Sequence, residues 1–539
     1  MELDRLSRVF DPKRVEEMFD VGDVDRVLVV TTLLICFSAW LWWYVFWTQR
    51  NRPGPYEFPV IGLLIQAQAN WHRLHDYITD YLYNVDTLRV NIGFGFMAVM
   101  TADPANIEYI MKTNFNNYPK GPRLISINQD FFGQGIFNAD GDLWIHQRKV
   151  AAIEFNSIRL RNFNTPIFND FGIRLVHRLM EKSMSKSQID LQELMSRMTL
   201  DTTVRIAFGV DLGSLAPSLP HVPVGKSYET ASTCSFTRFS HPFWKVEKFF
   251  QFGQEKRLKK AVADLDAFAY DVIQKRKKEL PDGKFMEQVN EEKDDLLSRF
   301  VKMSKQGDNR FGDRALRDIM VNYILAGRDS TSAVICWTMY MLVLNPEALG
   351  KVRQELAELM QKQSPPRDWD YLSEEKAIEA FAELLTFDNV GSLTYLHATI
   401  TETMRLYPPV PLNTKEAVAD DILPSGQIVR KGDAVVFHPY GMGRMPYIWG
   451  PDAADFKPER WIKDGVFQPE SPFKYIAFQG GPRLCLGKDS SYLQMKITVA
   501  LLTQFFDFKL VPGHRYRYKV MISLIFDDGL PVTVHKRKK

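Results

Sequence analysis

Cysteine is scarce in this chain, and the few cysteines that occur stand far apart. The four among 539 residues are Cys36, Cys234, Cys336 and Cys485. This spacing predicts no disulfide framework, because small disulfide-stabilised domains carry closely spaced cysteines. The cysteine content therefore indicates a reducing compartment, such as the cytosolic side of a membrane.

Excess charge and a nucleotide-binding loop are also missing. The net charge of +3 is too small to indicate nucleic acid as a partner. The stretch Gly93-Phe94-Gly95-Phe96 lacks the third glycine of a dinucleotide loop, and no helix follows it directly. We expect it to join two strands, Leu88–Ile92 and Met97–Thr101, as a hairpin. The chain is rich in apolar residues instead, with 45% hydrophobic and 13% aromatic residues, which predicts a large core with room for an apolar ligand.

One long uncharged run lies near the N-terminus. Residues 27–47 carry no charged side chain, and a helix of this length spans the roughly 30 Å hydrocarbon core of a bilayer. Tryptophan and tyrosine crowd the C-terminal end of the run, as in an interfacial aromatic belt. A buried core helix is the alternative. Lysine and arginine on the two flanks do not decide which side faces the cytosol.

These features divide the chain into four parts. Residues 1–26 are a polar segment, 27–47 a transmembrane anchor, 48–62 a proline-rich linker and 63–539 one globular domain. The prolines bias the linker towards an extended conformation up to Gly62.

Within the domain, the pattern predicts mainly helices with small sheets. We expect a short helix near 71–83, mostly helix over 160–280 with a break near 211–227, and an exposed loop over 280–295. Residues 236–252 are rich in aromatic side chains. Short strands are expected at Leu423–Ile428 and Ala434–His438.

Residues 313–344 form a long apolar helical pattern, which ends where Asn345-Pro346 predicts a boundary. Such a helix is roughly 48 Å long, enough to cross the domain. Its middle carries Asp329, Ser330 and Thr331 after a glycine, and hydroxyls that bond back to a helix can bend it. An exposed polar stripe is the alternative, but apolar residues flank this stretch on both sides.

Two further pairs of residues share a helix face. Trp144 and Arg148 are four apart within 138–155, so an indole N–H and a guanidinium can bind one anion there. A surface stack of the two side chains is equally consistent with this spacing. Glu402 and Arg405 are three apart and are also neighbours.

Cys485 is the most informative residue of the sequence. It lies just before an apolar helical pattern, where the helix dipole and free N–H groups favour a thiolate. A nucleophile would need a histidine base, and a zinc ligand a second cysteine or histidine at suitable spacing; this stretch offers neither. Haem iron needs one thiolate only, because the porphyrin supplies the in-plane ligands. A buried structural cysteine is the other interpretation of a lone thiol.

The pattern formed by Phe478, Gly481, Arg483, Cys485 and Gly487 resembles the haem-binding loop of the cytochrome P-450 family. The Trp-x-x-x-Arg, Asp-Ser-Thr, Glu-x-x-Arg and Pro-Glu-Arg-Trp motifs precede it in the family order, and the resemblance covers residues 53–535. Segments 101–121, 146–155, 443–461 and 465–488 are similar to the plant and fungal fatty-acid ω-hydroxylases. The resemblance implies the P-450 fold, mainly α with small β-sheets, preceded by one transmembrane helix.

The resemblance also implies roles for the residues of the haem site. Cys485 would be the iron ligand and Phe478 would pack near its sulfur, while Gly487 helps to form the tight bulge of the loop. Arg483 would bind a haem propionate. Trp144 and Arg148 would form the propionate-binding helix, and Lys415 is a further candidate cation at the haem rim.

Two other residue groups take their roles from the same resemblance. Asp329 and Ser330 would deliver protons during oxygen activation. The family usually has threonine directly after the acid, and here Thr331 comes one residue later, so either hydroxyl can serve. Glu402, Arg405 and Arg460 would form a buried structural triad.

The implied protein is a membrane-anchored monooxygenase with haem b. It would hydroxylate an unactivated C–H bond of a lipid, foremost a long-chain fatty acid at or near its ω end. Ala326 stands where animal relatives often carry a glutamate esterified to haem, so the haem would be held by the thiolate and non-covalent contacts. With no flavin or NAD(P) domain after the haem loop, electrons would come from a separate NADPH-dependent reductase, with cytochrome b5 as an optional second partner. The implied location is the endoplasmic reticulum membrane, single-pass, with the domain in the cytosol.

Three alternatives stay open at the level of sequence. The substrate can be a sterol or terpenoid instead of a fatty acid. A haem-thiolate isomerase or dehydratase would not need the acid–alcohol pair. A non-catalytic haem-binding protein would bind the cofactor without consuming NADPH.

Overall fold

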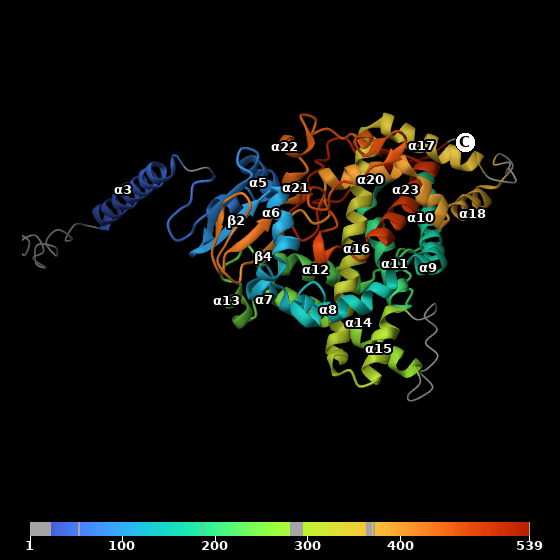
Figure 1. Ribbon diagram of the computed structural model, residues 1–539, viewed down its shortest axis with the longest axis horizontal. Helices are drawn as coiled ribbons and strands as arrows, with labels where there is room; N and C mark the ends of the chain where they lie inside the picture. The colour runs from blue at the N-terminus through green and yellow to red at the C-terminus, as the bar shows by residue number, and fades with distance from the viewer. Residues whose placement is uncertain are drawn as a thin grey trace, which may run out of the picture.

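The computed structural model describes residues 23–51, 54–185, 187–280, 295–362, 369 and 372–537. The described chain is mainly helical with small sheets, so the predicted fold class is confirmed (Figure 1). The helices before the long central helix are α3 Asp23–Gln49, α4 Leu64–Ala69, α5 Leu74–Leu82, α6 Pro104–Glu108, α7 Gly121–Phe132, α8 Gly141–Ala152, α9 Ser157–Arg159, α10 Thr165–Ser185, α11 Leu191–Phe208, α12 Pro223–Thr237, α13 Trp244–Phe250, α14 Gly253–Glu279 and α15 Leu296–Lys305. From the central helix onwards they are α16 Asp313–Leu344, α17 Pro346–Gln361, α18 Glu374–Leu384, α19 Phe387–Ser392, α20 Thr394–Leu406, α21 Pro439–Met442, α22 Pro446–Trp449 and α23 Lys488–Phe505.

The strands form one four-stranded sheet and several smaller ones. They are β1 Thr87–Gly93, β2 Phe96–Thr101, β3 Gln188–Asp190, β4 Asn413–Glu416, β5 Asp421–Ile422, β6 Ile428–Val429, β7 Ala434–Phe437, β8 Ile462–Lys463, β9 Val466–Phe467, β10 Phe506–Leu510, β11 Tyr518–Lys519, β12 Ile525–Phe526 and β13 Pro531–Lys536. The largest sheet has the order β1-β2-β7-β4, in which β2 and β7 run parallel. Its antiparallel β1–β2 hairpin confirms the reading of the Gly93–Phe96 stretch as a turn.

Helix α16 is the longest helix of the globular domain and has the predicted bounds, Asp313–Leu344. Figure 1 shows it passing through the middle of the globular domain, between the sheet side and the C-terminal helices. Helix α11 packs directly against it. At Gly327 a Cβ atom would lie 2.2 Å from Oγ1 of Thr203 on α11, so only glycine permits this approach. The polar stretch of α16 therefore lies at a close helix–helix crossing inside the domain.

Helix α3 projects away from the globular domain at its N-terminal side (Figure 1). Within the described residues, Val27–Gln49 is the one straight helix long and apolar enough to cross a membrane, and most of its side chains are exposed. The predicted N-terminal apolar helix is confirmed and indicates a membrane anchor.

Three local predictions need correction. Leu423–Ile428 is not one strand: residues 423–427 form the turn between β5 and β6, where Gly426 has φ +83° after Pro424-Ser425, and Ile428 begins β6. The linker is not extended up to Gly62, because Phe58 and Gly62 exchange backbone hydrogen bonds across a turn that packs on β1. The predicted break at 211–227 ends early, since α12 begins at Pro223, a residue suited to the first helical turn.

Some predictions fall on residues outside the described part. These are most of the polar segment 1–26, Arg52 and Pro53 of the linker, and most of the loop 280–295.

Candidate functional site

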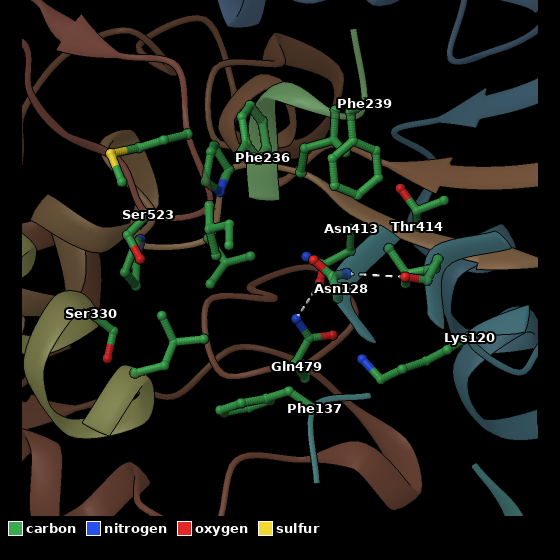
Figure 2. Close-up of a pocket in the computed structure, with 18 of the residues that line it drawn as sticks. Lys120, Asn128, Phe137, Phe236, Phe239, Ser330, Asn413, Thr414, Gln479 and Ser523 are labelled. Atoms are coloured by element: carbon green, nitrogen blue, oxygen red, sulfur yellow. Dashed lines mark hydrogen bonds between the residues drawn. The ribbon is translucent and has the colours of Figure 1, made fainter. Parts of the chain in front are cut away.

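One large cavity of about 1260 Å³ lies between α16, the Cys485 loop and the β1–β2 side of the domain. Cys485, Ser330 and Thr331 line it at one end, and apolar residues of α5, β1 and β2 line it at the other. Figure 2 shows Ser330 on α16 at one side of this space and Lys120 at the opposite side, with Gln479 between them. The cavity therefore joins a thiol, hydroxyls and cations to a long apolar wall.

The loop around Cys485 is held by backbone geometry. The Cys485 N–H donates to the carbonyl of Phe478 at 2.8 Å. Gly481 has φ +58°, and a Cβ there would lie 2.1 Å from the carbonyl oxygen of Met111, so the position requires glycine. At Gly487 a Cβ would lie 3.3 Å from the ring of Phe155. These contacts close the loop tightly and leave the Cys485 side chain open to the cavity.

The charge state of Cys485 reflects two opposing effects. Burial raises the pKa of the thiol, whereas a hydrogen bond from the Gly487 N–H and the positive charge of Arg148 lower it. Burial has the larger effect, so the position before α23 does not by itself produce a thiolate. A cation bound at the sulfur would reverse this balance.

Three of the predicted propionate-binding residues lie together beside this loop. Arg483 forms an ion pair with Asp140, and its guanidinium lies 4.3 Å from the ring of Trp144. Arg148 donates to the carbonyl of Leu484 at 2.6 Å and lies 5.9 Å from the same ring. All three predicted side chains line the cavity. The structure thus brings together the loop and helix α8, which are more than 300 residues apart in the chain.

Two lysines complete this cluster of cations. Lys415, the further candidate cation at the haem rim, is buried on β4, and Lys120 precedes α7. Burial and the nearby Arg483 lower the pKa of Lys120 to about 7, and burial lowers the pKa of Lys415 well below its usual range. Within the described part of the chain, neither ammonium group has a hydrogen bond or ion pair. The sequence analysis missed Lys120, because nothing in the local pattern distinguishes it from a surface lysine.

The polar stretch of α16 divides between the cavity and the interior. Ser330 and Thr331 line the cavity, whereas Asp329 is buried behind them and pairs with Arg328. The Ser330 hydroxyl donates to the carbonyl of Ala326 at 2.7 Å, as expected for a hydroxyl that bonds back to its helix. Burial raises the pKa of Asp329 although Arg328 opposes the shift. The hydroxyls are therefore the groups in contact with the cavity, and the acid stands behind them.

Backbone and side-chain contacts also attach the loop after α7 to α16. The Phe137 N–H donates to Oδ1 of Asn322 at 2.9 Å, and the Gln134 N–H donates to Oδ2 of Asp318 at 2.8 Å. This loop places Phe137 against the cavity (Figure 2). Sequence reasoning gave no sign of these anchors, because their partners lie far along the chain.

The predicted triad is assembled away from the cavity surface. Glu402 accepts two hydrogen bonds of 2.7 Å from Arg405, and both side chains are fully buried. Arg460 lies 3.5 Å from Glu402 and donates to the carbonyls of Trp449 and Asp452 at 2.9 Å. Glu402 also accepts hydrogen bonds from the Lys457 N–H and the Trp461 indole, both at 2.9 Å. The triad ties α20 to the segment that leads into the Cys485 loop.

The described residues form a mainly helical domain in which the Cys485 thiol lies on the wall of an apolar cavity, close to a cluster of lysine and arginine side chains. These features define the class of proteins that hold an iron porphyrin through a cysteine, since the thiol meets the metal and the cations meet the propionates.

The comparisons identify the family within this class. The cytochrome P450 family model matches residues 52–521. Cytochrome P450 704B1 of Arabidopsis thaliana is 44% identical, with 91% of this chain and 96% of the relative covered. Cytochrome P450 704C1 of Pinus taeda is 40% identical, with 96% of this chain and 99% of the relative covered. Cytochrome P450 86B1 of Arabidopsis thaliana is 39% identical, with 91% of this chain and 87% of the relative covered. This chain belongs to the cytochrome P450 family: it is a haem-thiolate monooxygenase that receives electrons from a reductase.

The residues of the cavity fit haem b, the cofactor of this family. A metal at Cys485 would offset the burial that keeps the thiol protonated. Lys120, Lys415 and Arg483 have pKa values lowered by burial and gain from anionic partners such as propionates. The donor set and the charges of the site thus match a porphyrin iron with carboxylate edges.

The buried triad generates a prediction about stability. Glu402→Gln keeps the shape of the side chain but leaves Arg405 without its charged partner, and breaking a buried pair in this way costs about 3–5 kcal/mol. We expect a clear fall in the urea concentration at which the far-ultraviolet circular dichroism signal is half lost.

The control is Glu459→Gln, which removes the acid next to Arg460 in the Pro-Glu-Arg-Trp motif. Glu459 pairs with Lys351 at the surface, and such pairs are worth about 0–1 kcal/mol. Equal midpoints for the two variants would contradict a stabilising role for the triad.

Proposed function

We propose that this monooxygenase hydroxylates a long-chain fatty acid at or near its ω end. The observation that carries the proposal is the continuous cavity with Cys485 and Ser330 at one end and apolar residues of α5, β1 and β2 at the other. An unbranched acyl chain matches an apolar passage of this kind and brings its terminal carbons to the reactive end. The local similarity to the fatty-acid ω-hydroxylases in segments 101–121 and 465–488 supports the same substrate class.

Ligand binding tests the substrate class directly. We expect fatty acids of graded length to shift the haem spin state of the purified holoenzyme, with affinity that rises with chain length. Affinity should rise because each buried methylene contributes about 0.8 kcal/mol. Spin shifts from a sterol or terpenoid, without any from fatty acids, would show that the substrate is a sterol or terpenoid and not a fatty acid.

We propose Cys485 as the iron ligand, with Arg483, Trp144 and Arg148 at the propionates and Phe478 beside the sulfur. Lys120 and Lys415 add two cations on the propionate side. At position 326 the alanine methyl cannot form an ester, so the haem is held by the thiolate and these non-covalent contacts.

The ligand assignment predicts a spectroscopic change. The ferrous–CO complex of the wild type should show the absorption band of thiolate ligation, and Cys485→His should lose it because imidazole replaces the sulfur. Cys336→Ser is the control, since Cys336 is buried in the core away from the cavity. A thiolate-type band that survives in Cys485→His would exclude this assignment.

Bound haem supplies the oxygen chemistry, in which the thiolate favours O–O cleavage. In the proposed mechanism the protein positions the chain terminus and controls protons. Ser330 and Thr331 present hydroxyls to the cavity. Asp329, whose pKa is raised by burial, stands behind them as the group that holds a proton. Opening of the Arg328–Asp329 pair would remove the positive charge that favours the carboxylate, so that Asp329 takes up a proton and passes it to the hydroxyls.

This relay predicts uncoupling in hydroxyl variants. Assistance by a general acid contributes about 10²–10⁴-fold to a rate. Ser330→Ala should therefore preserve the substrate spin shift while NADPH electrons are diverted to peroxide. Product formed per NADPH is compared for Ser330→Ala, Thr331→Ala and the double variant.

The three variants separate the possible outcomes. Uncoupling by Thr331→Ala alone would transfer the role to Thr331. Full coupling in the double variant would exclude the relay and favour a haem-thiolate isomerase.

We also propose that α3 anchors the protein in the endoplasmic reticulum with the domain in the cytosol, where the reductase and cytochrome b5 can reach it. The apolar α3 supports the anchor, and exposed aromatic side chains on and beside α13 support contact of this face with the membrane; they are Phe243, Phe249, Phe250 and Phe252. Protection of the domain from protease in sealed microsomes would contradict the cytosolic orientation.

A further inference from the structure

Seven lysine and arginine side chains of the described residues line the cavity, and their electrostatic environments differ. They are Lys120, Arg123, Arg148, Arg238, Lys245, Lys415 and Arg483. A monooxygenase of a fatty acid has one more anion to accommodate than haem supplies, namely the substrate carboxylate. The question is which of these cations remains available for it.

Four of the seven belong to the cluster beside the Cys485 loop. The charge of Arg483 lowers the pKa of both Lys120 and Lys415, and Arg148 lowers that of Arg483. These side chains are close enough to repel one another and lie at the end of the cavity where the haem binds. They are therefore matched to the propionates.

A fifth cation is already neutralised by the protein. Arg238 is buried and forms ion pairs of 2.6 Å with both Asp130 and Glu255. Its guanidinium also donates to the Ile127 carbonyl. Arg238 thus supports the cavity wall and has no capacity for a further anion.

Arg123 differs from these five. It lies in the first turn of α7, is exposed at the rim of the cavity, and its guanidinium carbon lies 3.1 Å from the ring centre of Phe96 at the start of β2. Partial burial lowers the pKa of Arg123, while the charge of Glu416 raises it. Within the described part of the chain, its guanidinium has no hydrogen bond and no ion pair.

Lys245, the seventh cation, is a weaker candidate. It lies exposed on α13, and its ammonium is 5.7 Å from the ring of Trp244. A lysine is a flexible point charge, whereas the planar fork of an arginine packed on an aromatic ring is preorganised for two hydrogen bonds to a carboxylate.

We propose that Arg123 binds the carboxylate of the substrate at the outer end of the cavity. The inference rests on the proposed fatty-acid function and adds the residue that fixes the orientation of the chain. With the carboxylate on Arg123 and the haem cluster occupied by propionates, the acyl chain lies along the apolar wall and its ω end reaches the Cys485 end. Glu416 weakens this interaction, because its negative charge lies near the same guanidinium.

The test compares a long-chain fatty acid with its methyl ester, which keeps the chain and removes the charge. Dissociation constants are measured by spin-shift titration of the holoenzyme for the wild type and for Arg123→Gln. A hydrogen bond to a charged group contributes about 1.5–3 kcal/mol, which corresponds to a loss of roughly 10–100-fold in acid affinity. Affinity for the ester should stay unchanged, and Arg123→Lys should restore part of the affinity for the acid.

Two matched variants serve as controls. Lys245→Gln removes the other cation of the rim and should change neither dissociation constant. Glu416→Gln should strengthen binding of the acid, because it removes the competing charge.

Each contrary outcome has a distinct meaning. Wild-type protein that binds acid and ester equally well retains the fatty-acid function but has no carboxylate site, which overturns the proposal. If Arg123→Gln weakens the binding of acid and ester equally, Arg123 only shapes the cavity. If Lys245→Gln alone weakens the binding of the acid, Lys245 binds the carboxylate. Both results overturn the proposal as well. Binding of neither ligand by the wild type refutes the fatty-acid function, and the proposal falls with it.

Discussion

Desolvation of charge inside one apolar cavity is the constraint on which this structure depends. Burial raises the pKa of the Cys485 thiol and lowers the pKa values of Lys120, Lys415 and Arg483. Burial thus disfavours the charged forms of these groups, which costs free energy. A cofactor with a cationic metal and anionic edges reverses the shift at both places. The same electrostatic imbalance explains why the site selects a porphyrin iron with carboxylate side chains.

The scaffold around the cavity is arranged to keep this geometry rigid. The Glu402–Arg405 pair is fully buried, with Arg460 beside it, and ties α20 to the segment that precedes the Cys485 loop. Gly481 allows the loop to approach the carbonyl of Met111, and Gly327 allows α11 to approach α16. Buried ion pairs and close backbone contacts tolerate little displacement, so the sulfur on one wall and the hydroxyls on the other keep their separation.

The position of α16 in the domain decides which of its polar residues face the cavity and which face the interior. Ser330 and Thr331 face the cavity, whereas Asp329 faces the interior, where Arg328 balances its charge. An acid in direct contact with an apolar substrate would carry a larger desolvation cost. Placing the hydroxyls in front and the acid behind keeps the cavity apolar and still leaves a proton source one residue away.

The sequence by itself determined the features that depend on neighbouring residues. The bounds of α16, the apolar helix α3, the β1–β2 hairpin and the pattern of five residues around Cys485 are all local, because periodicity, prolines and glycines act over a few positions. The strand predicted at Leu423–Ile428 was wrong, although Pro424-Ser425-Gly426 is a local sequence typical of a turn. Tertiary structure alone decided the cluster of cations, because Lys120, Arg148, Lys415 and Arg483 come from four separate segments. It also decided that Asp329 turns inward and that Arg123 has no ion pair among the described residues. Burial and long-range charge set these properties, and both exist only once the chain has folded.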